Sequence, residues 1–132
     1  MKTGSAMTLP CNLDVIAPDG SEVRVLLSLA AGSMAHFTLP ARQVSRAVRH
    51  RTVEEIWYVL SGTGEMWRSD GNGREEFSPL SAGTCLTIPV GIAFQFRSLD
   101  DAPLAAVAVT LPPWPADGEA ELVTGKWTPT VS

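Results

Sequence analysis

Residues 50–64 read HRTVEEIWYVLSGTG and contain one histidine, two adjacent glutamates, an apolar run and two glycines. Residues two apart on a strand share a face, so Glu55 and Trp57 point one way while Ile56 and Tyr58 point the other. Glycine adopts the positive backbone angles of tight turns more readily than any other residue. The stretch therefore predicts a half-buried β-strand that ends in a glycine turn.

The same pattern recurs along the chain. Short runs rich in β-branched and aromatic residues alternate with turn signals such as PDG at 18–20 and SDGNG at 69–73. Several short strands at this spacing indicate an all-β sandwich or barrel. The predicted strands cover residues 23–29, 34–39, 44–48, 56–60, 65–68, 75–77, 84–88, 94–98 and 104–111. The one helical signal is a short turn at 117–122.

The 132 residues suffice for one domain with one core. The formal net charge of −4 argues against a nucleic-acid binder, which would show a basic stripe. No apolar run approaches the roughly 20 residues that cross a bilayer, and the N-terminus lacks the apolar segment of a signal peptide. We therefore expect a cytoplasmic protein that binds neither nucleic acid nor membrane, with Cys11 and Cys85 as free thiols.

The two ends of the chain differ from its middle. We expect an N-terminal arm at 1–20, a barrel at 21–111 and a C-terminal arm at 112–132. Prolines in the last segment exclude a central strand, because proline cannot donate a hydrogen bond to a sheet. Its tryptophans, Trp114 and Trp127, would be costly to leave in water. The C-terminal arm is therefore predicted to pack on its own barrel or on a partner subunit.

Two motifs resemble those of the cupin superfamily of small β-barrels. The first family motif is approximately G-x5-H-x-H-x3,4-E-x6-G, and here Glu55 is followed by six residues and then Gly62. His50 takes the place of the second histidine, and Val48 that of the first. Arg42 stands where the family has its leading glycine. The first motif therefore retains its turn glycine and lacks one of the metal ligands.

The second family motif is approximately G-x5-P-x-G-x2-H-x3-N. Gly83, Pro89 and Gly91 match it, whereas Phe94 replaces the histidine and Ser98 replaces the asparagine. The resemblance implies an all-β double-stranded β-helix, the cupin or jelly-roll barrel, over roughly residues 23–111. It also implies a homodimer, which is common among small single-domain cupins of unassigned function.

Mapped onto that barrel, the inward positions form an apolar, aromatic pocket with a few polar groups, the usual form of a small-molecule site. They are Arg46, Val48, His50, Glu55, Trp57, Phe94 and Phe96. His36 has the opposite parity to Phe37 and is expected at the surface or at a strand edge. Arg46 is either an anchor for a carboxylate or phosphate of the ligand or a solvated arginine at the rim.

His50 and Glu55 allow two interpretations. They could form a hydrogen-bonded pair without an ion, in which the carboxylate raises the pKa of the imidazole. They could instead be two ligands of one divalent metal completed by water, although Val48 and Phe94 cannot coordinate. The expected cofactor is accordingly none or one divalent metal.

Three functions follow. The first is a metal-independent isomerase, epimerase or lyase in which His50 is the general acid and base and Glu55 orients it. The second is a non-catalytic module that binds a sugar or a small carboxylate. The third is a metal-dependent cupin oxygenase with a depleted ligand set, disfavoured by the apolar residues at Val48 and Phe94.

Overall fold

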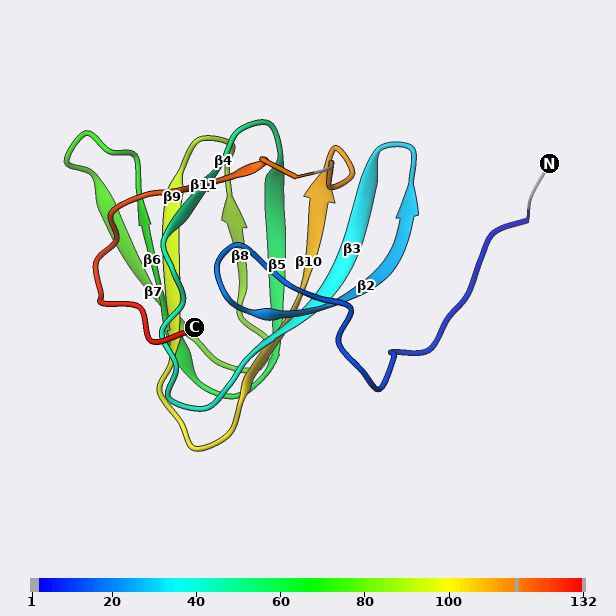
Figure 1. Cartoon of the computed structure of the whole chain (residues 1–132), viewed down its shortest axis with the longest axis horizontal. Helices are drawn as coiled ribbons and strands as arrows, with labels where there is room; N and C mark the ends of the chain where they lie inside the picture. The colour runs from blue at the N-terminus through cyan, green and yellow to red at the C-terminus, as the bar shows by residue number, and fades with distance from the viewer. Residues whose placement is uncertain (1–2, 116, 132) are drawn as a thin grey trace.

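The computed structural model describes residues 3–115 and 117–131. These residues form two antiparallel sheets, and no helix occurs among them. Figure 1 shows the sheets facing one another, with β6, β7 and β9 on one side and β2, β3, β5 and β10 toward the other. The predicted all-β double-stranded β-helix is confirmed.

The larger sheet has six strands in the order β1-β2-β3-β10-β5-β8. Their bounds are Val15–Ile16 for β1, Glu22–Leu29 for β2, Gly32–Leu39 for β3, Leu104–Leu111 for β10, Glu54–Ser61 for β5 and Cys85–Ile88 for β8. The smaller sheet has five strands in the order β11-β4-β9-β6-β7. Their bounds are Ala120–Leu122 for β11, Val48–His50 for β4, Ala93–Ser98 for β9, Gly64–Ser69 for β6 and Glu75–Leu80 for β7.

The core lies between the two sheets and follows the predicted alternation. On β5, Glu55, Trp57 and Val59 are buried while the residues between them are exposed. Inward residues from both sheets complete one cluster, which includes Phe37, Val48, Met66, Phe94, Phe96 and Leu104. A strand that is apolar on one face only is stable because the opposite sheet covers that face.

The turn after β5 explains the glycine at the end of the first motif. Gly62 has a φ of +85°, a conformation that strains other residues. A Cβ at this position would lie 2.5 Å from the carbonyl oxygen of Pro103, so only glycine lets the turn approach the start of β10 this closely. The E-x6-G spacing therefore joins an inward carboxyl to a turn that has no room for a side chain.

Two predicted elements are wrong in part. The strand expected at 44–48 is reduced to one isolated bridge between Val44 and Arg97, and β4 begins only at Val48. The backbone N–H of Arg46 donates instead to the carbonyl of Asp19 in the loop before β2. The helical turn expected at 117–122 is replaced by β11, which pairs with β4 and so satisfies its backbone groups there.

The expected position of His36 at the surface or at a strand edge is also corrected. It faces the opposite way from Phe37, as its parity predicts, but it is buried rather than exposed, with 8% of its surface accessible. Arg24 lies beside it on β2, and the guanidinium of Arg24 donates to the carbonyls of Pro10 and Cys11. The N-terminal segment is thus tied to the outer face of this sheet, where the sequence pattern places solvent.

Both ends of the chain add a strand to a sheet edge: β1 pairs with β2, and β11 pairs with β4. Before β1, Pro10, Cys11 and Asp14 are hydrogen-bonded to β2, and the chain ahead of them runs away from the two sheets (Figure 1). After β11, the side-chain amide of Gln95 donates to the carbonyl of Trp127 and accepts from two backbone N–H groups, which ties the C-terminal arm to β9.

Cys11 and Cys85 are free and exposed. Within the described residues, no helix is long and apolar enough to cross a membrane.

Candidate functional site

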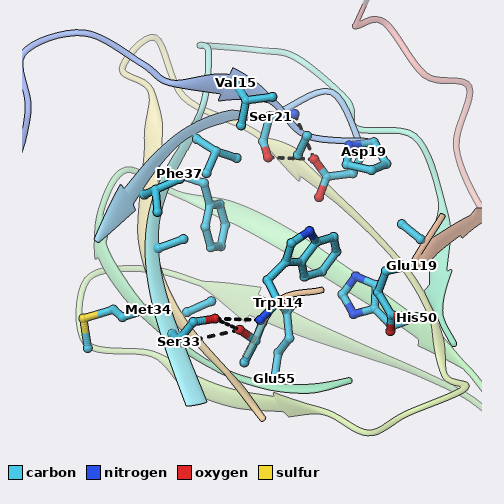
Figure 2. Close-up of a pocket in the computed structure, with 18 of the residues that line it drawn as sticks. Val15, Asp19, Ser21, Ser33, Met34, Phe37, His50, Glu55, Trp114 and Glu119 are labelled. Atoms are coloured by element: carbon cyan, nitrogen blue, oxygen red, sulfur yellow. Dashed lines mark hydrogen bonds between the residues drawn. The ribbon is translucent and has the colours of Figure 1, made fainter. Parts of the chain in front are cut away.

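One cavity of about 550 Å³ opens between the sheets. Its wall combines inward side chains of β3, β4, β5 and β9 with residues of the loop between β1 and β2 and of the C-terminal arm. Figure 2 shows the arrangement, with Asp19 and Ser21 at the top, Glu55 at the bottom, and His50 and Glu119 at one side. The cavity is large enough for a small organic molecule.

Five of the seven predicted pocket residues line this cavity, namely Val48, His50, Glu55, Trp57 and Phe94. Phe96 does not belong to the wall; it is 1% exposed and packs edge-on against Trp57, with ring centroids 4.9 Å apart. Arg46 is half-buried, and its guanidinium lies 3.4 Å from the carbonyl of Pro18, outside the lining. The ligand-binding roles of these residues remain predictions.

Glu55 is a buried carboxyl, 9% exposed, on the inner face of β5. One of its oxygens accepts a hydrogen bond from the indole N–H of Trp57 at 3.1 Å, the one such bond to its carboxyl among the described residues. Burial raises the pKa of Glu55 to about 7; the bond from Trp57 opposes the shift, and Asp19 adds to it. A carboxyl with this pKa changes charge near neutral pH.

His50 lies on β4, 5% exposed, and its Nδ1 has no hydrogen-bond partner among the described residues. Burial lowers the pKa of His50 to about 4, although the charge of Glu119 opposes the shift. No hydrogen bond joins His50 to Glu55 in the described part of the chain. The predicted hydrogen-bonded pair with a raised histidine pKa is therefore wrong, because His50 and Glu55 form no bond and the burial of the imidazole outweighs the charge of Glu119.

Three further carboxyls of the cavity, those of Asp19, Asp117 and Glu119, come from outside the barrel strands. Asp19 accepts hydrogen bonds from the backbone N–H and the hydroxyl of Ser21 at 2.8 and 2.6 Å. Burial raises the pKa of Asp19, although these bonds and Arg46 lower it. In the sequence, Asp19 appears only as part of the PDG turn signal, and nothing in that signal places the turn at the mouth of a cavity.

Glu119 lies beside His50 (Figure 2). Its carboxylate accepts from the backbone N–H and hydroxyl of Thr52 at 2.6 and 2.8 Å and from the backbone N–H of Val53 at 2.8 Å. Burial alone would raise the pKa of Glu119, but these bonds and His50 together lower it. Glu119 is thus an ionised group of the wall, which the sequence pattern places in a helical turn.

Trp114 of the C-terminal arm completes the aromatic part of the wall. Its ring packs edge-on against His50, with centroids 5.1 Å apart, while Phe94 does the same from another side at 5.3 Å. The backbone N–H of Trp114 donates to the hydroxyl of Ser33 at 2.9 Å, and that hydroxyl contacts the hydroxyl of Thr110. The arm is therefore fastened to β3 and β10 at the place where Trp114 covers the cavity.

The donors present do not fit a metal centre of the kind that cupin barrels hold. Such a centre takes three or more protein ligands, and the described residues contain no group of three His, Cys, Asp or Glu placed to hold one ion. Val48 and Phe94 stand where the family motifs have histidine ligands, and they are directly paired on the neighbouring strands β4 and β9. A metal held by His50 and Glu55 alone remains a prediction.

Comparison with solved structures shows the same fold at low identity. An uncharacterized conserved protein with a double-stranded beta-helix domain from Klebsiella pneumoniae is 18% identical, with a TM-score of 0.65 over 83% of this chain and 89% of the other. KdgF from Halomonas sp. is 15% identical, with a TM-score of 0.62 over 76% and 87%. CapF with the inhibitor 3-isopropenyl-tropolone is 16% identical, with a TM-score of 0.71 over 89% of this chain and 34% of that one.

No curated protein matches this chain. The structural likenesses, all below 25% identity, support the fold and leave the activity open. The family model described as Cupin domain matches residues 35–110, which include both motifs and most of the inner strands. Because that match covers more than half of the 132 residues, this chain belongs to the cupin family.

Proposed function

We propose that this cupin binds a small organic molecule in its cavity and moves a proton to or from it through Glu55, as a metal-independent isomerase, epimerase or lyase. The observation that carries the proposal is the position of Glu55: a buried carboxyl with a single hydrogen bond, facing a cavity of about 550 Å³. A general acid or base works best when its pKa lies near the working pH, and the pKa of Glu55 is about 7.

This proposal changes the roles expected for both motif residues. His50 is neutral at pH 7 because burial lowers its pKa to about 4, so it offers a polar contact rather than a proton-transfer group. Glu55 takes the acid and base role. Its carboxylate removes a proton from a ligand carbon next to a carbonyl or imine, whose double bond accepts the electron pair. In an epimerase, the planar intermediate turns over and the carboxylic acid returns the proton to the other face of the same carbon. In an isomerase, the carboxylic acid protonates the former carbonyl carbon, while the hydroxyl on the first carbon gives its proton to the former carbonyl oxygen. In a lyase, a leaving group on the next carbon departs with the electron pair and takes up the proton.

Proton exchange into the ligand tests this function. Protein in D₂O is mixed with small aldoses, ketones, amino sugars and amino acids, and proton NMR follows the loss of C–H signals. We expect exchange in at least one compound, lost in Glu55→Gln, whose amide oxygen still accepts the bond from Trp57. Glu54→Gln, on the exposed face of the same strand, is the matched control.

The second candidate is a binding module without turnover. It is favoured by the mostly apolar lining, in which His50 is neutral and forms no hydrogen bond with Glu55. Thermal-shift screening of the same compounds separates the two functions. A compound that stabilises the protein without C–H exchange in any member of the panel supports the binding module and contradicts the enzyme.

A homodimer and a cytoplasmic location remain inferences from the sequence. Exposed apolar side chains near β1 and β2, among them Leu13, Val15, Ile16 and Leu29, support the homodimer because a partner would cover them. Sedimentation equilibrium tests it: the expected mass is twice that of the chain. A mass equal to that of one chain at every concentration measured contradicts it.

A further inference from the structure

The groups of the cavity wall that can carry a charge at pH 7 are all carboxyls. Its titratable residues are Asp19, His50, Glu55, Asp117 and Glu119, and no lysine or arginine lines it among the described residues. Burial keeps the imidazole of His50 neutral at pH 7, since it lowers the pKa to about 4. Arg46, the cation expected in the pocket, acts on Asp19 from outside the lining. The wall therefore offers a ligand negative charge and hydrogen-bond acceptors.

The polar groups of this wall are also incompletely paired. The carboxyl of Glu55 forms one hydrogen bond with the described residues, and the Nδ1 of His50, a residue 5% exposed, forms none. Buried polar atoms in folded proteins are nearly always paired, so such atoms beside a cavity indicate a ligand or water that completes them. Glu119, in contrast, has three bonds from Thr52 and Val53 and contributes fixed charge.

Aromatic rings surround the same space. Trp57, Phe94 and Trp114 line the cavity, and the rings of Phe94 and Trp114 both contact His50. The face of an aromatic ring attracts a cation, most strongly for tryptophan and away from water. A protonated nitrogen meets both requirements of this wall, since it is positively charged and carries only hydrogen-bond donors.

We propose that the ligand of this cavity carries a protonated amine on a compact skeleton, with the ammonium group between the carboxyl of Glu55 and the aromatic rings. This substrate class rests on the proposed function and narrows it. It replaces the small carboxylate expected from the sequence, because the arginine that would anchor an anion does not line the cavity. A carboxylate or phosphate would instead be placed among Asp19, Glu55 and Glu119.

Three ligands of matched size and different charge test the proposal: benzylamine, benzyl alcohol and benzoate. Isothermal titration at pH 8 measures each with the wild type, Glu55→Gln and Glu54→Gln. We expect benzylamine to bind at least about 10-fold more tightly than the other two, which corresponds to about 1.4 kcal/mol. Glu55→Gln should weaken benzylamine about 10-fold, whereas Glu54→Gln, outside the cavity, should change it less than 2-fold.

The pH dependence provides a second readout. A cation favours the ionised form of Glu55, so binding should release a proton near pH 7, where this carboxyl is partly protonated. Asp19, His50, Asp117 and Glu119 are the other titratable groups of the wall, and Arg46 acts on Asp19 from outside it. We expect the affinity for benzylamine to rise from pH 6 to pH 8, with proton release detected as a dependence of the heat on the buffer. Both effects should disappear in Glu55→Gln.

The outcomes separate this proposal from the function on which it rests. Equal or tighter binding of benzyl alcohol or benzoate overturns the charge preference and leaves small-molecule binding intact. Unchanged benzylamine affinity in Glu55→Gln overturns the position of the ammonium group. If none of the three ligands binds, the amine class is overturned, while proton exchange in the D₂O panel still decides the proposed function.

Discussion

The indole N–H of Trp57 donates to the carboxyl of Glu55 at 3.1 Å, two residues away on the same face of β5. This is the single hydrogen bond that the carboxyl makes within the described residues. It stabilises the ionised form and so opposes the larger effect of burial, which raises the pKa of Glu55 to about 7. The balance between these two effects sets the pH at which Glu55 becomes negatively charged.

Replacing Trp57 with phenylalanine should therefore raise the pKa of Glu55 above its present value of about 7, because the opposing bond is lost and burial remains. Carbon-13 NMR of the glutamate side chains, followed from pH 4 to 10, measures the change. Trp67→Phe is the matched control, since Trp67 donates to Glu75 at 2.7 Å on the other sheet. A lower or unchanged pKa of Glu55 in Trp57→Phe would contradict the role of this bond.

Glu55 and His50 should affect stability in opposite directions with pH. Glu55 has a folded pKa raised from 4.5 to about 7, so its contribution is complete below 4.5 and is lost as pH rises to about 7. Relative to the wild type, Glu55→Gln should gain stability across that window. The expected gain is on the order of 3 kcal/mol, from about 1.4 kcal/mol per pH unit.

His50 has a folded pKa lowered from 6.5 to about 4, so its contribution is present above 6.5 and is lost as pH falls to about 4. His50→Gln should therefore gain stability relative to the wild type as pH falls through that window. Urea unfolding at intervals of half a pH unit measures both differences, with Glu54→Gln as the surface control. Differences that do not depend on pH would refute both pKa shifts.

Gly62 and Gly71 allow crowding to be separated from backbone strain. Their φ angles are +85° and +80°, but a Cβ at Gly62 would meet the carbonyl of Pro103 at 2.5 Å, whereas one at Gly71 would meet nothing within 4 Å. We expect Gly71→Ala to cost about 1–2 kcal/mol from the positive φ alone. Gly62→Ala should cost a further 1–3 kcal/mol or so from overpacking. Equal changes in the urea midpoint would show that the close approach at Gly62 is unimportant.

Metal content provides the fourth prediction. Protein purified without chelator should contain sub-stoichiometric Fe, Mn, Ni and Zn, and His50→Ala should not change the amounts, because the donors do not form a three-ligand site. The double substitution Val48→His and Phe94→His restores the two histidine ligands at paired positions of β4 and β9. The resulting variant should bind zinc stoichiometrically. Stoichiometric metal in the wild type that is lost in His50→Ala would establish the two-ligand site instead.

Local patterns predicted most strands correctly. The alternation along β5 and the glycine turn after it involve residues that are close in sequence, and a strand with one apolar face needs only an opposite sheet to become buried. The segment at 44–48 was predicted wrongly because its backbone bonds to Asp19, a partner that no local pattern identifies. His36 shows the same limit: parity predicted its direction, while the N-terminal segment tied down by Arg24 decided its burial.

Strand parity groups Glu55 with Trp57 on one face of a strand, and the resemblance to the cupin motifs then predicts the barrel and the inward positions of these residues and of His50. The chemistry of the cavity depends on contacts between distant parts of the chain. Asp19, Trp114 and Glu119 reach the wall from the two ends of the chain, and burial sets the pKa values of His50 and Glu55 in opposite directions. The protonation state of a buried side chain depends on all its neighbours in space, so it cannot be derived from spacing along the chain.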